Sequence, residues 1–177
     1  MVSKMVTIRH ATIGDLGDIT EIYNHAILNT TATFDTEPKS WDEQKQWFDH
    51  HGPEYAILVA ELDGQVVAWA SLSKWSDRCA YSETAEGSLY VKEGYRGHGI
   101  GKRLLRCLLE EGRGAGLHTI IGRVAGGNEV SLRLLRSSGF LPIGRMREVG
   151  RKFGRLLDVE LMQYIFKPER AKTAKGG

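Results

Sequence analysis

The sequence has few cysteines, little net charge and no long apolar run, and each shortage argues against a class of protein. Cys79 and Cys107 are the two cysteines, with no C-x-x-C pair and no histidine at zinc-ligand spacing, so a disulfide framework and a structural metal are not expected. A formal net charge of +2 does not predict a nucleic-acid partner. No stretch reaches the ~18 to 20 apolar residues of a membrane span. We therefore expect a soluble protein of the reducing cytoplasm, without a membrane partner.

The length and composition fit a single domain. The chain has 177 residues, of which 41% are hydrophobic and 26% are charged, enough for a substantial core. We assign the domain to residues 1–166. Residues 167–177 carry Pro, Lys, Ala and a terminal Gly-Gly, and we expect them to be a frayed tail.

The most informative stretch runs from Tyr90 to Leu105. An apolar strand ending at Val91 enters a turn containing Gly97, Gly99 and Gly101, and a helix with apolar residues at helical spacing follows. Such a turn leaves backbone N–H groups unshielded, and the first turn of a helix has donors without partners inside the helix. Positive charge is added by Arg96, Lys102 and Arg103. These features predict a pyrophosphate site, although the glycine spacing alone equally fits a flexible turn with a solvated basic face.

Two well-known phosphate-binding loops do not fit this stretch. A P-loop needs Gly five residues before the Gly-Lys pair, where this chain has Arg96, and Ser or Thr after the Lys, where it has Arg103. The dinucleotide-binding fingerprint needs its third Gly at Lys102.

The order of the predicted elements indicates an α/β fold with a mixed sheet. Asp63-Gly64 joins two β-rich runs, which is a strong hairpin signal, while strands and helices alternate elsewhere. Ser40 with Glu43, and Asn128, are predicted helix caps. The predicted strands cover residues 6–9, 55–62, 65–72, 84–91, 117–124, 140–143 and 156–166, with a basic, glycine-containing hairpin or loop between the last two; the predicted helices cover residues 15–28, about 40–48, 101–112 and 129–138.

Two separate motifs resemble those of one family. The run from Arg96 to Gly101 after Val91 resembles the acetyl-coenzyme A loop of the GNAT family of N-acetyltransferases, and the run from Asn128 to Phe140 resembles the helix that follows in that family. The resemblance spans about residues 6–166. It implies a single-domain GNAT fold, with a strongly twisted mixed sheet covered by helices on both faces. It also implies that acetyl-CoA is bound by Leu89, Tyr90, Val91, Arg96, Gly97, His98, Gly99, Ile100, Gly101, Lys102, Asn128 and Ser131.

Within this family, the chain is similar to the phosphinothricin and methionine sulfone (methionine sulfoximine) acetyltransferases. The similarity lies in residues 22–24, 29–38, 84–91 and 150–158. It implies transfer of an acetyl group to the α-amine of a small amino-acid-like substrate, and a homodimer.

Two positions depart from the family pattern. Many members have a tyrosine that protonates the leaving thiolate where this chain has Leu135, so no tyrosine acid is expected there. The branch often has Arg-Trp where this chain has Arg155-Leu156, which leaves the shape of that part of the substrate pocket open.

The resemblance implies direct transfer in a ternary complex, with Glu86 as the general base. A carboxylate that is partly removed from water has a raised pKa and can take the ammonium proton, directly or through water. The alternative is a paired structural carboxylate. The family further implies that a backbone N–H near Leu89, at a bulge where the strands part, meets the thioester oxygen.

The expected substrate contacts are Phe34, Arg78 and Tyr81. Phe34 lies in a Thr-rich connection that either lines a pocket or only links two helices. Arg78 can form a bidentate pair with a carboxylate, but a solvated loop arginine is equally consistent with the sequence.

Two other functions fit the same residues. One is acetylation of a protein or peptide N-terminus, and the other is a non-catalytic CoA-binding sensor module. The sequence does not identify the amine, the general acid or the oligomeric state.

Overall fold

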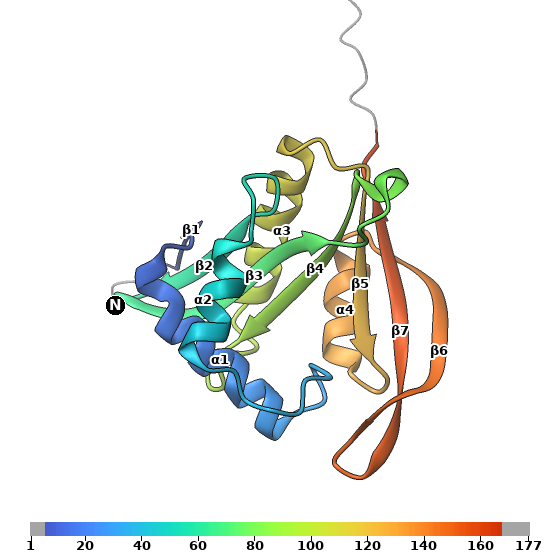
Figure 1. Ribbon diagram of the computed structural model, residues 1–177, viewed down its shortest axis with the longest axis horizontal. Coiled ribbons are helices and arrows are strands. Elements are labelled where there is room, and N and C mark those ends of the chain that lie inside the picture. Colours follow the sequence, from blue (N-terminus) through green and yellow to red (C-terminus); the bar gives the residue numbers. More distant parts are fainter. Residues whose placement is uncertain (1–5, 168–177) are drawn as a thin grey trace, which may run out of the picture.

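The structure is a computed structural model that describes residues 6–167 (Figure 1). Apart from Lys167, the tail predicted over residues 167–177 lies outside the described residues. The elements follow one another in the order β1 (Thr7–His10), η1 (Ile13–Asp15), α1 (Leu16–Asn29), α2 (Trp41–Asp49), β2 (Ile57–Leu62), β3 (Gln65–Lys74), η2 (Cys79–Tyr81), β4 (Thr84–Val91), α3 (Ile100–Gly114), β5 (Thr119–Ala125), α4 (Glu129–Ser137), β6 (Leu141–Lys152) and β7 (Arg155–Ile165), where η marks a 3₁₀-helix.

The strands form one mixed sheet in the order β1-β2-β3-β4-β5-β7-β6. Neighbouring strands are antiparallel except for β4 and β5, which are parallel. The β2–β3 hairpin turns at Asp63 and Gly64, which have φ values of 52° and 79°. Positive φ at both central residues is the geometry that Asp-Gly favours in a two-residue hairpin. The predicted hairpin and the mixed α/β sheet are therefore confirmed.

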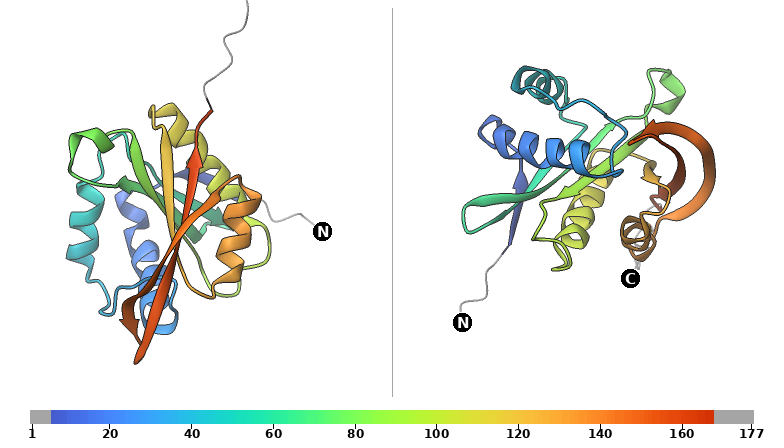
Figure 2. Two further views of the ribbon diagram at one scale, coloured as in Figure 1. Left: turned by 90° about the vertical axis from the view of Figure 1, so that its right-hand side faces the viewer. Right: turned by 90° about the horizontal axis from the view of Figure 1, so that it is seen from below.

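Helices cover both faces of the sheet, and the two faces differ in composition (Figure 2). We call the side under α3 and α4 the aliphatic face, because its core consists largely of Leu, Ile, Val and Ala. We call the side under α1 and α2 the aromatic face. Its buried cluster consists of Ile19, Ile22, Ile57, Val59, Val66 and Trp69, against which Tyr23, Trp47 and Tyr90 pack.

Two predicted caps are present. Ser40 Oγ accepts a hydrogen bond from Glu43 N at 3.2 Å, and a carboxylate oxygen of Glu43 accepts one from Ser40 N at 2.8 Å. This capping box begins α2. Asn128 Oδ1 accepts a hydrogen bond from Ser131 N at 3.1 Å, so Asn128 caps α4.

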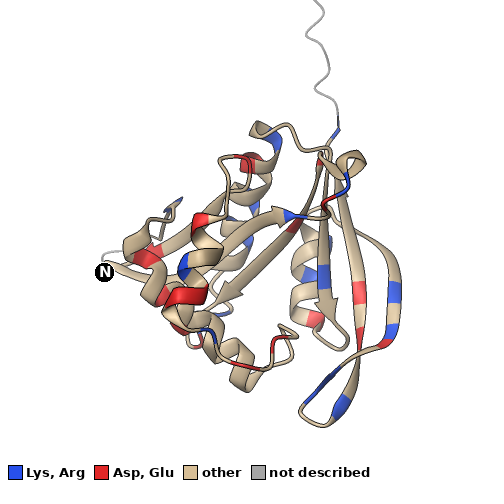
Figure 3. Cartoon of the chain, viewed as in Figure 1, with Lys and Arg blue, Asp and Glu red and all other residues tan. Residues whose placement is uncertain are grey.

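The last hairpin is longer than the sequence predicts. The strand expected over residues 140–143 extends as β6 to Lys152, and the turn is confined to Phe153 and Gly154, with φ values of 49° and 71°. Strand β6 is the outer strand of the sheet and is mostly exposed, so it lacks the apolar alternation that marks a half-buried strand. Figure 3 shows Lys and Arg along this hairpin.

Candidate active site

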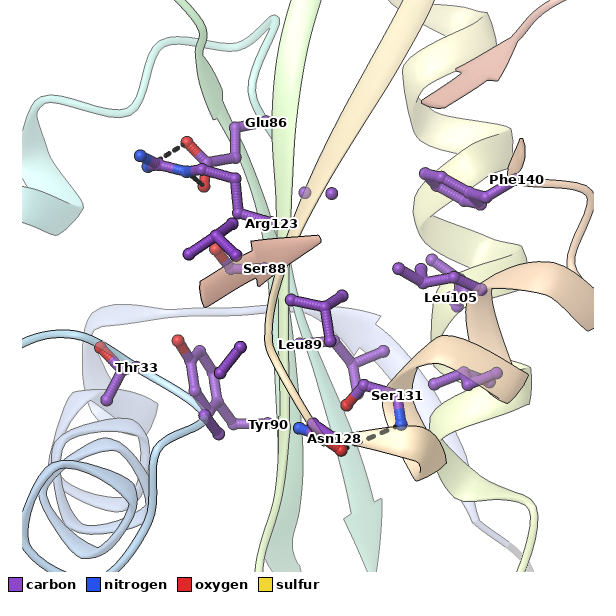
Figure 4. Close-up of a pocket in the computed structure, with 18 of the residues that line it drawn as sticks. Thr33, Glu86, Ser88, Leu89, Tyr90, Leu105, Arg123, Asn128, Ser131 and Phe140 are labelled. Atoms are coloured by element: carbon purple, nitrogen blue, oxygen red, sulfur yellow. Dashed lines mark hydrogen bonds and ion pairs between the residues drawn. The ribbon is translucent and has the colours of Figure 1, made fainter. Parts of the chain in front are cut away.

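A cavity opens where β4 and β5 separate. The two strands pair only over Thr84–Glu86 and Thr119–Ile121. Beyond Glu86, β4 continues beside β3, while β5 continues beside β7. The cavity occupies about 540 Å³ in this gap, and its walls come from both strands, α3, α4, the connection after α1 and the β6–β7 hairpin (Figure 4).

The resemblance implied a bulge near Leu89, but the opening between the strands has a different origin. The register of β3 and β4 is uninterrupted from Ala68 opposite Val91 to Lys74 opposite Ala85. Instead, β4 loses its partner on the β5 side, so the backbone of that edge from Gly87 onward faces the gap. Leu89 itself lines the cavity.

Glu86 lies in this cavity and is paired with Arg123 of β5. Arg123 Nε and Nη2 donate to the two carboxylate oxygens of Glu86, each at 2.6 Å, and the Glu86 side chain is 20% exposed. A bidentate pair fixes the direction of both groups (Figure 4). Arg123 is not among the site residues predicted from the sequence, although it is the single charged residue in the β5 run TIIGRVA, which was the available signal.

The glycine turn has the predicted backbone geometry. Gly97 and Gly99 have φ values of 81° and 77°, a region that favours glycine, and a Cβ at either position would meet no atom within 4 Å. The space beside the turn is therefore open to a ligand. The first backbone bond of α3 runs from Arg103 N to Gly99 O at 3.1 Å, so the preceding N–H groups of the helix have no partner within it.

The side chains around this turn differ in what they can offer a ligand. Arg96, His98 and Lys102 are exposed. Ile100 is only 3% exposed and belongs to the aliphatic core, so it can contribute its backbone N–H alone. Val91 O accepts a hydrogen bond from Arg96 Nε at 3.2 Å, which holds this side chain beside the end of β4.

The far side of the cavity is formed by α4. Asn128 and Ser131 line it, and so does Leu135, the position where many family members have a tyrosine. Leu135 presents no group that can donate a proton there.

Tyrosine hydroxyls and a carboxylate form the wall nearest α1. Tyr23 Oη lies 3.0 Å from Thr33 Oγ1 and donates to Asp35 Oδ2 at 2.8 Å. Burial raises the pKa of Tyr23 to about 12 and raises the pKa of Tyr90 as well, so both hydroxyls stay protonated near neutral pH. This wall therefore offers neutral hydroxyl groups to a ligand.

The connection after α1 is fastened to the last hairpin. Phe34 lines the cavity and packs so closely on Gly150 that a Cβ there would lie 2.3 Å from Phe34 Cε2. Lys152 is 4% exposed, and its Nζ donates to Thr33 O at 2.8 Å. Desolvation lowers the pKa of Lys152. Nothing local in the sequence marks this contact, because Thr33 and Lys152 are 119 positions apart.

The structure brings six of the sixteen predicted site residues into the cavity, while Val91 and the residues of the glycine turn lie outside its lining. Leu89, Tyr90, Asn128, Ser131, Glu86 and Phe34 line the cavity. Arg78 and Tyr81 are exposed residues at the 3₁₀-helix η2 and are not among the lining residues. Their predicted substrate contacts therefore have no support from this geometry.

Comparison with known proteins identifies the family. The model of the Acetyltransferase (GNAT) family matches residues 19–140, a stretch that contains the glycine turn, Glu86 and the cap of α4. The chain belongs to this family and is an N-acetyltransferase. The GNAT fold expected from the resemblance is confirmed.

Relatives of closely similar length point to small amine substrates and to acetyl-CoA. The L-methionine sulfoximine/L-methionine sulfone acetyltransferase of Pseudomonas aeruginosa is 40% identical over 167 residues, which cover 93% of this chain and 97% of that protein. A phosphinothricin acetyltransferase from Sinorhizobium meliloti, solved in complex with AcCoA, is 36% identical with a TM-score of 0.88, over 90% of this chain and 88% of that chain.

A third similar protein has a different kind of substrate in its description. The ribosomal-protein-alanine N-acetyltransferase from Brucella melitensis is 39% identical with a TM-score of 0.88, and the match covers 90% of this chain and 99% of that chain.

Residues 6–167 contain neither a membrane-spanning helix nor a cluster of metal-binding side chains. No helix in that range is both long enough and apolar enough to span a membrane. Nor does the range contain a group of three or more His, Cys, Asp or Glu side chains that could hold a metal ion.

Proposed function

We propose that this protein transfers the acetyl group of acetyl-CoA to the α-amine of a small amino-acid-like substrate of the methionine sulfoximine, methionine sulfone or phosphinothricin type. One observation carries the proposal: the carboxylate of Glu86 lies in the same cavity as Leu89 and the α4 residues Asn128 and Ser131. The proposed base and the residues expected to hold the thioester therefore line one cavity. The named relatives support the substrate class.

Acetyl-CoA fits the residues present. The N–H groups at the start of α3 suit the pyrophosphate, since they have no partner within the helix and the glycines leave the space beside them open. Exposed Arg96 and Lys102 add positive charge. The free edge of β4 beyond Glu86 offers backbone donors and acceptors to the thiol-bearing arm of acetyl-CoA. When bound, acetyl-CoA supplies the reactive thioester.

The proposed reaction is direct. Glu86 accepts a proton from the substrate ammonium, directly or through water, and the free amine then attacks the thioester carbonyl. A C–N bond forms, the C–S bond breaks and the sulfur leaves as a thiolate. Because a free thiol has a pKa of ~8.5, the thiolate can leave without a dedicated acid, and it then takes, directly or through water, the second proton that the nitrogen loses as the amide forms. This suits a cavity in which Leu135 replaces the tyrosine.

Arg123 has a positioning role in this proposal. Its two hydrogen bonds aim the Glu86 carboxylate, and its side chain is 52% exposed, so it can also meet a negative group of the substrate. Phe34 forms part of the cavity wall. The substrate contacts of Arg78 and Tyr81 remain predictions from the sequence.

A second candidate function is acetylation of a protein N-terminus. The similar protein from Brucella melitensis favours it, because its description names a ribosomal protein as the substrate. A peptide would need to reach Glu86 with its first residue.

Acetyl-CoA-dependent thiol release against an amine panel separates these functions. The panel holds methionine sulfone, methionine sulfoximine, phosphinothricin, common amino acids, polyamines and N-terminal peptides. Selective turnover of the three analogues is expected. Turnover of peptides alone would replace the proposal with the second candidate, and acetyl-CoA binding with no turnover of any amine would indicate a sensor module.

We further infer a homodimer working in the cytoplasm. Support for the dimer comes from exposed apolar side chains on the last hairpin, namely Leu141, Ile143, Val149, Phe153, Leu156 and Ile165. Free thiols at Cys79 and Cys107 are typical of a reducing compartment. Sedimentation of the purified protein tests the dimer.

A further inference from the structure

A second cavity adjoins the first on the aromatic face. It occupies about 300 Å³ and is walled by residues of α1, α2, β3, β4 and the connection after α1. It shares four lining residues with the cavity that contains Glu86, namely Tyr23, Asp35, Ser88 and Tyr90. The two spaces are therefore neighbours with a common wall.

Trp69 lines this second cavity and carries an unusual group. Its side chain is 4% exposed, and within residues 6–167 its Nε1 is the buried side-chain polar atom that has no hydrogen-bond partner. Three rings hold the indole in place, with centroid distances of 5.7 Å to Tyr23, 5.5 Å to Trp47 and 4.9 Å to Tyr90. A buried donor without an acceptor destabilises the fold, so a fixed and unsatisfied N–H calls for a ligand atom or water.

Other uncharged polar groups line the same cavity. Ser71 is 2% exposed and Gln44 is 5% exposed, and both line the cavity. Hydroxyl and amide groups can donate to an oxygen without adding a positive charge. The cavity thus combines aromatic walls with neutral donors, a combination that suits a polar but uncharged group.

The charged residues of this cavity disfavour an anion. Asp35 and Glu43 each contribute a carboxylate to its lining, and Lys39 contributes an ammonium group. Lys39 Nζ lies 3.3 Å from Asp35 Oδ2. Two negative charges against one positive charge leave a formal net charge of −1. A phosphinate or a second carboxylate would be repelled here, whereas a sulfone or sulfoximine would not.

The strand register connects this cavity to Glu86. Three cross-strand pairs follow one another on the aromatic face: Ser73 opposite Glu86, Ser71 opposite Ser88, and Trp69 opposite Tyr90. Residues two apart on a strand share a face and are separated by ~6.8 Å. A substrate amine near Glu86 can therefore direct its side chain past Ser71 and Ser88 toward Trp69.

We propose that the second cavity is the subsite for the side chain of the acceptor amino acid, and that the Trp69 indole N–H donates a hydrogen bond to an uncharged oxygen on it, as in a sulfone or sulfoximine. This inference rests on the proposed function and narrows it, because it favours methionine sulfone and methionine sulfoximine over the anionic phosphinothricin. Trp69 is thus a specificity residue and takes no part in the chemistry.

Indole NMR on the wild-type protein tests the contact without altering the fold. The chain has four tryptophans, so a protein labelled with ¹⁵N at the indole gives four N–H signals. With CoA bound, methionine sulfone should shift the Trp69 signal, whereas methionine, which lacks the oxygens, should shift it far less. A Trp69 signal that does not move at saturating sulfone overturns the proposal.

Kinetics of Trp69→Phe test the energetic role. Phenylalanine retains a ring but removes the N–H, so KM for methionine sulfone should rise roughly tenfold or more with kcat within about twofold, while kcat/KM for methionine changes little. The control is Trp75→Phe, since Trp75 lies outside both cavities and should leave the ratio of the two substrates unchanged.

The two proposals fail in different ways. Absence of turnover of methionine sulfone, methionine sulfoximine and phosphinothricin alike by the wild-type enzyme refutes the proposed function, whereas turnover of phosphinothricin alone refutes this inference and leaves the proposed function standing. Turnover of the sulfone by the wild type, combined with an equal loss for both substrates in Trp69→Phe, shows a purely structural Trp69 and refutes this inference alone.

Discussion

The two faces of the sheet have different side chains in their cores, and within residues 6–167 the buried side-chain polar atom without a partner lies on one of them. The aliphatic face buries side chains such as Leu104 and Leu108 at 0% and 1% exposure. The aromatic face packs rings at angles, with Trp69 and Tyr23 at 76°, and holds the second cavity and the unpartnered indole N–H, while the first cavity lies in the gap between β4 and β5 and is walled from both faces. Aliphatic side chains interlock closely, whereas rings carry polar tips that need partners. The buried aliphatic core therefore supplies stability, and the aromatic face supplies recognition of the substrate side chain.

The largest expected effect on the recognition side comes from Glu86→Gln. The amide keeps the shape but cannot take the ammonium proton, so kcat should fall by ~10²-fold or more, with acetyl-CoA affinity nearly intact. Steady-state kinetics and coenzyme titration measure both quantities. Glu83→Gln removes a nearby exposed carboxylate just before β4 and should leave kcat unchanged. Full turnover by the Glu86 variant would sink the assignment of the base.

On the stability side, Leu104→Ala should have the largest effect. The side chain is fully buried and does not line either cavity, so its truncation should lower the free energy of unfolding by ~2–5 kcal/mol, leaving KM values unchanged. Urea unfolding measures the loss. Leu28→Ala, at a position that is 54% exposed, should cost far less. A changed KM for the substrate in Leu104→Ala would show that the aliphatic core also affects substrate binding.

Asp15→Asn tests whether an arginine pair can be purely structural on the aromatic side. Arg9 Nη1 and Nη2 donate to Asp15 at 2.8 Å each, a pair like that of Glu86 with Arg123 but outside both cavities. These bonds lower the pKa of Asp15 from 3.8 to about 2, so the stabilisation is present above pH ~4 and is lost as pH falls through about 2. The variant should lose about 2 kcal/mol at pH 7.

Urea unfolding of both proteins at pH 7 and at pH 3 measures this difference. The gap between wild type and Asp15→Asn should narrow at the lower pH. Asp77→Asn provides the control, because Asp77 is fully exposed and its pair with Lys74 should contribute little. A gap that is the same at both pH values would show that the Asp15 charge contributes nothing.

The smallest effect is expected at a glycine of the turn. Gly99→Ala places a Cβ at a φ of 77°, which should cost ~1 kcal/mol through the backbone and raise KM for acetyl-CoA a few-fold. Gly17→Ala, within α1 and with open space around its Cβ, should instead be neutral or slightly stabilising. Steady-state kinetics and thermal unfolding of the two variants measure both effects. A KM for acetyl-CoA that is the same in Gly99→Ala and in the wild type would show that the turn does not take part in coenzyme binding.

The parts of the fold that follow local rules could be predicted from the sequence. Asp63-Gly64 specifies its turn, Ser40 with Glu43 and Asn128 specify their caps, and β4 begins and ends where its alternation does. The glycine turn could likewise be predicted, because positive φ values favour glycine.

The rest depends on contacts between distant segments. The full length of β6 could not be predicted, because an exposed strand lacks the apolar alternation that marks a half-buried one. The pairing of Arg123 with Glu86 depends on which strands become neighbours in the sheet. Burial of Lys152 depends on a carbonyl 119 positions away, and the unpartnered N–H of Trp69 depends on three surrounding rings. No local pattern encodes these, so the walls of the site are less predictable than the turn.

The limited pairing of β4 with β5 also has a mechanical consequence. Only three residue pairs join the two halves of the sheet between β4 and β5, so the halves are held together at one end and are separate at the other. A ligand that lies in the gap contacts both halves of the sheet and connects them. Coenzyme binding should therefore slow amide hydrogen exchange in β4 and β5 together, and it should link the opening of the two halves into one cooperative event.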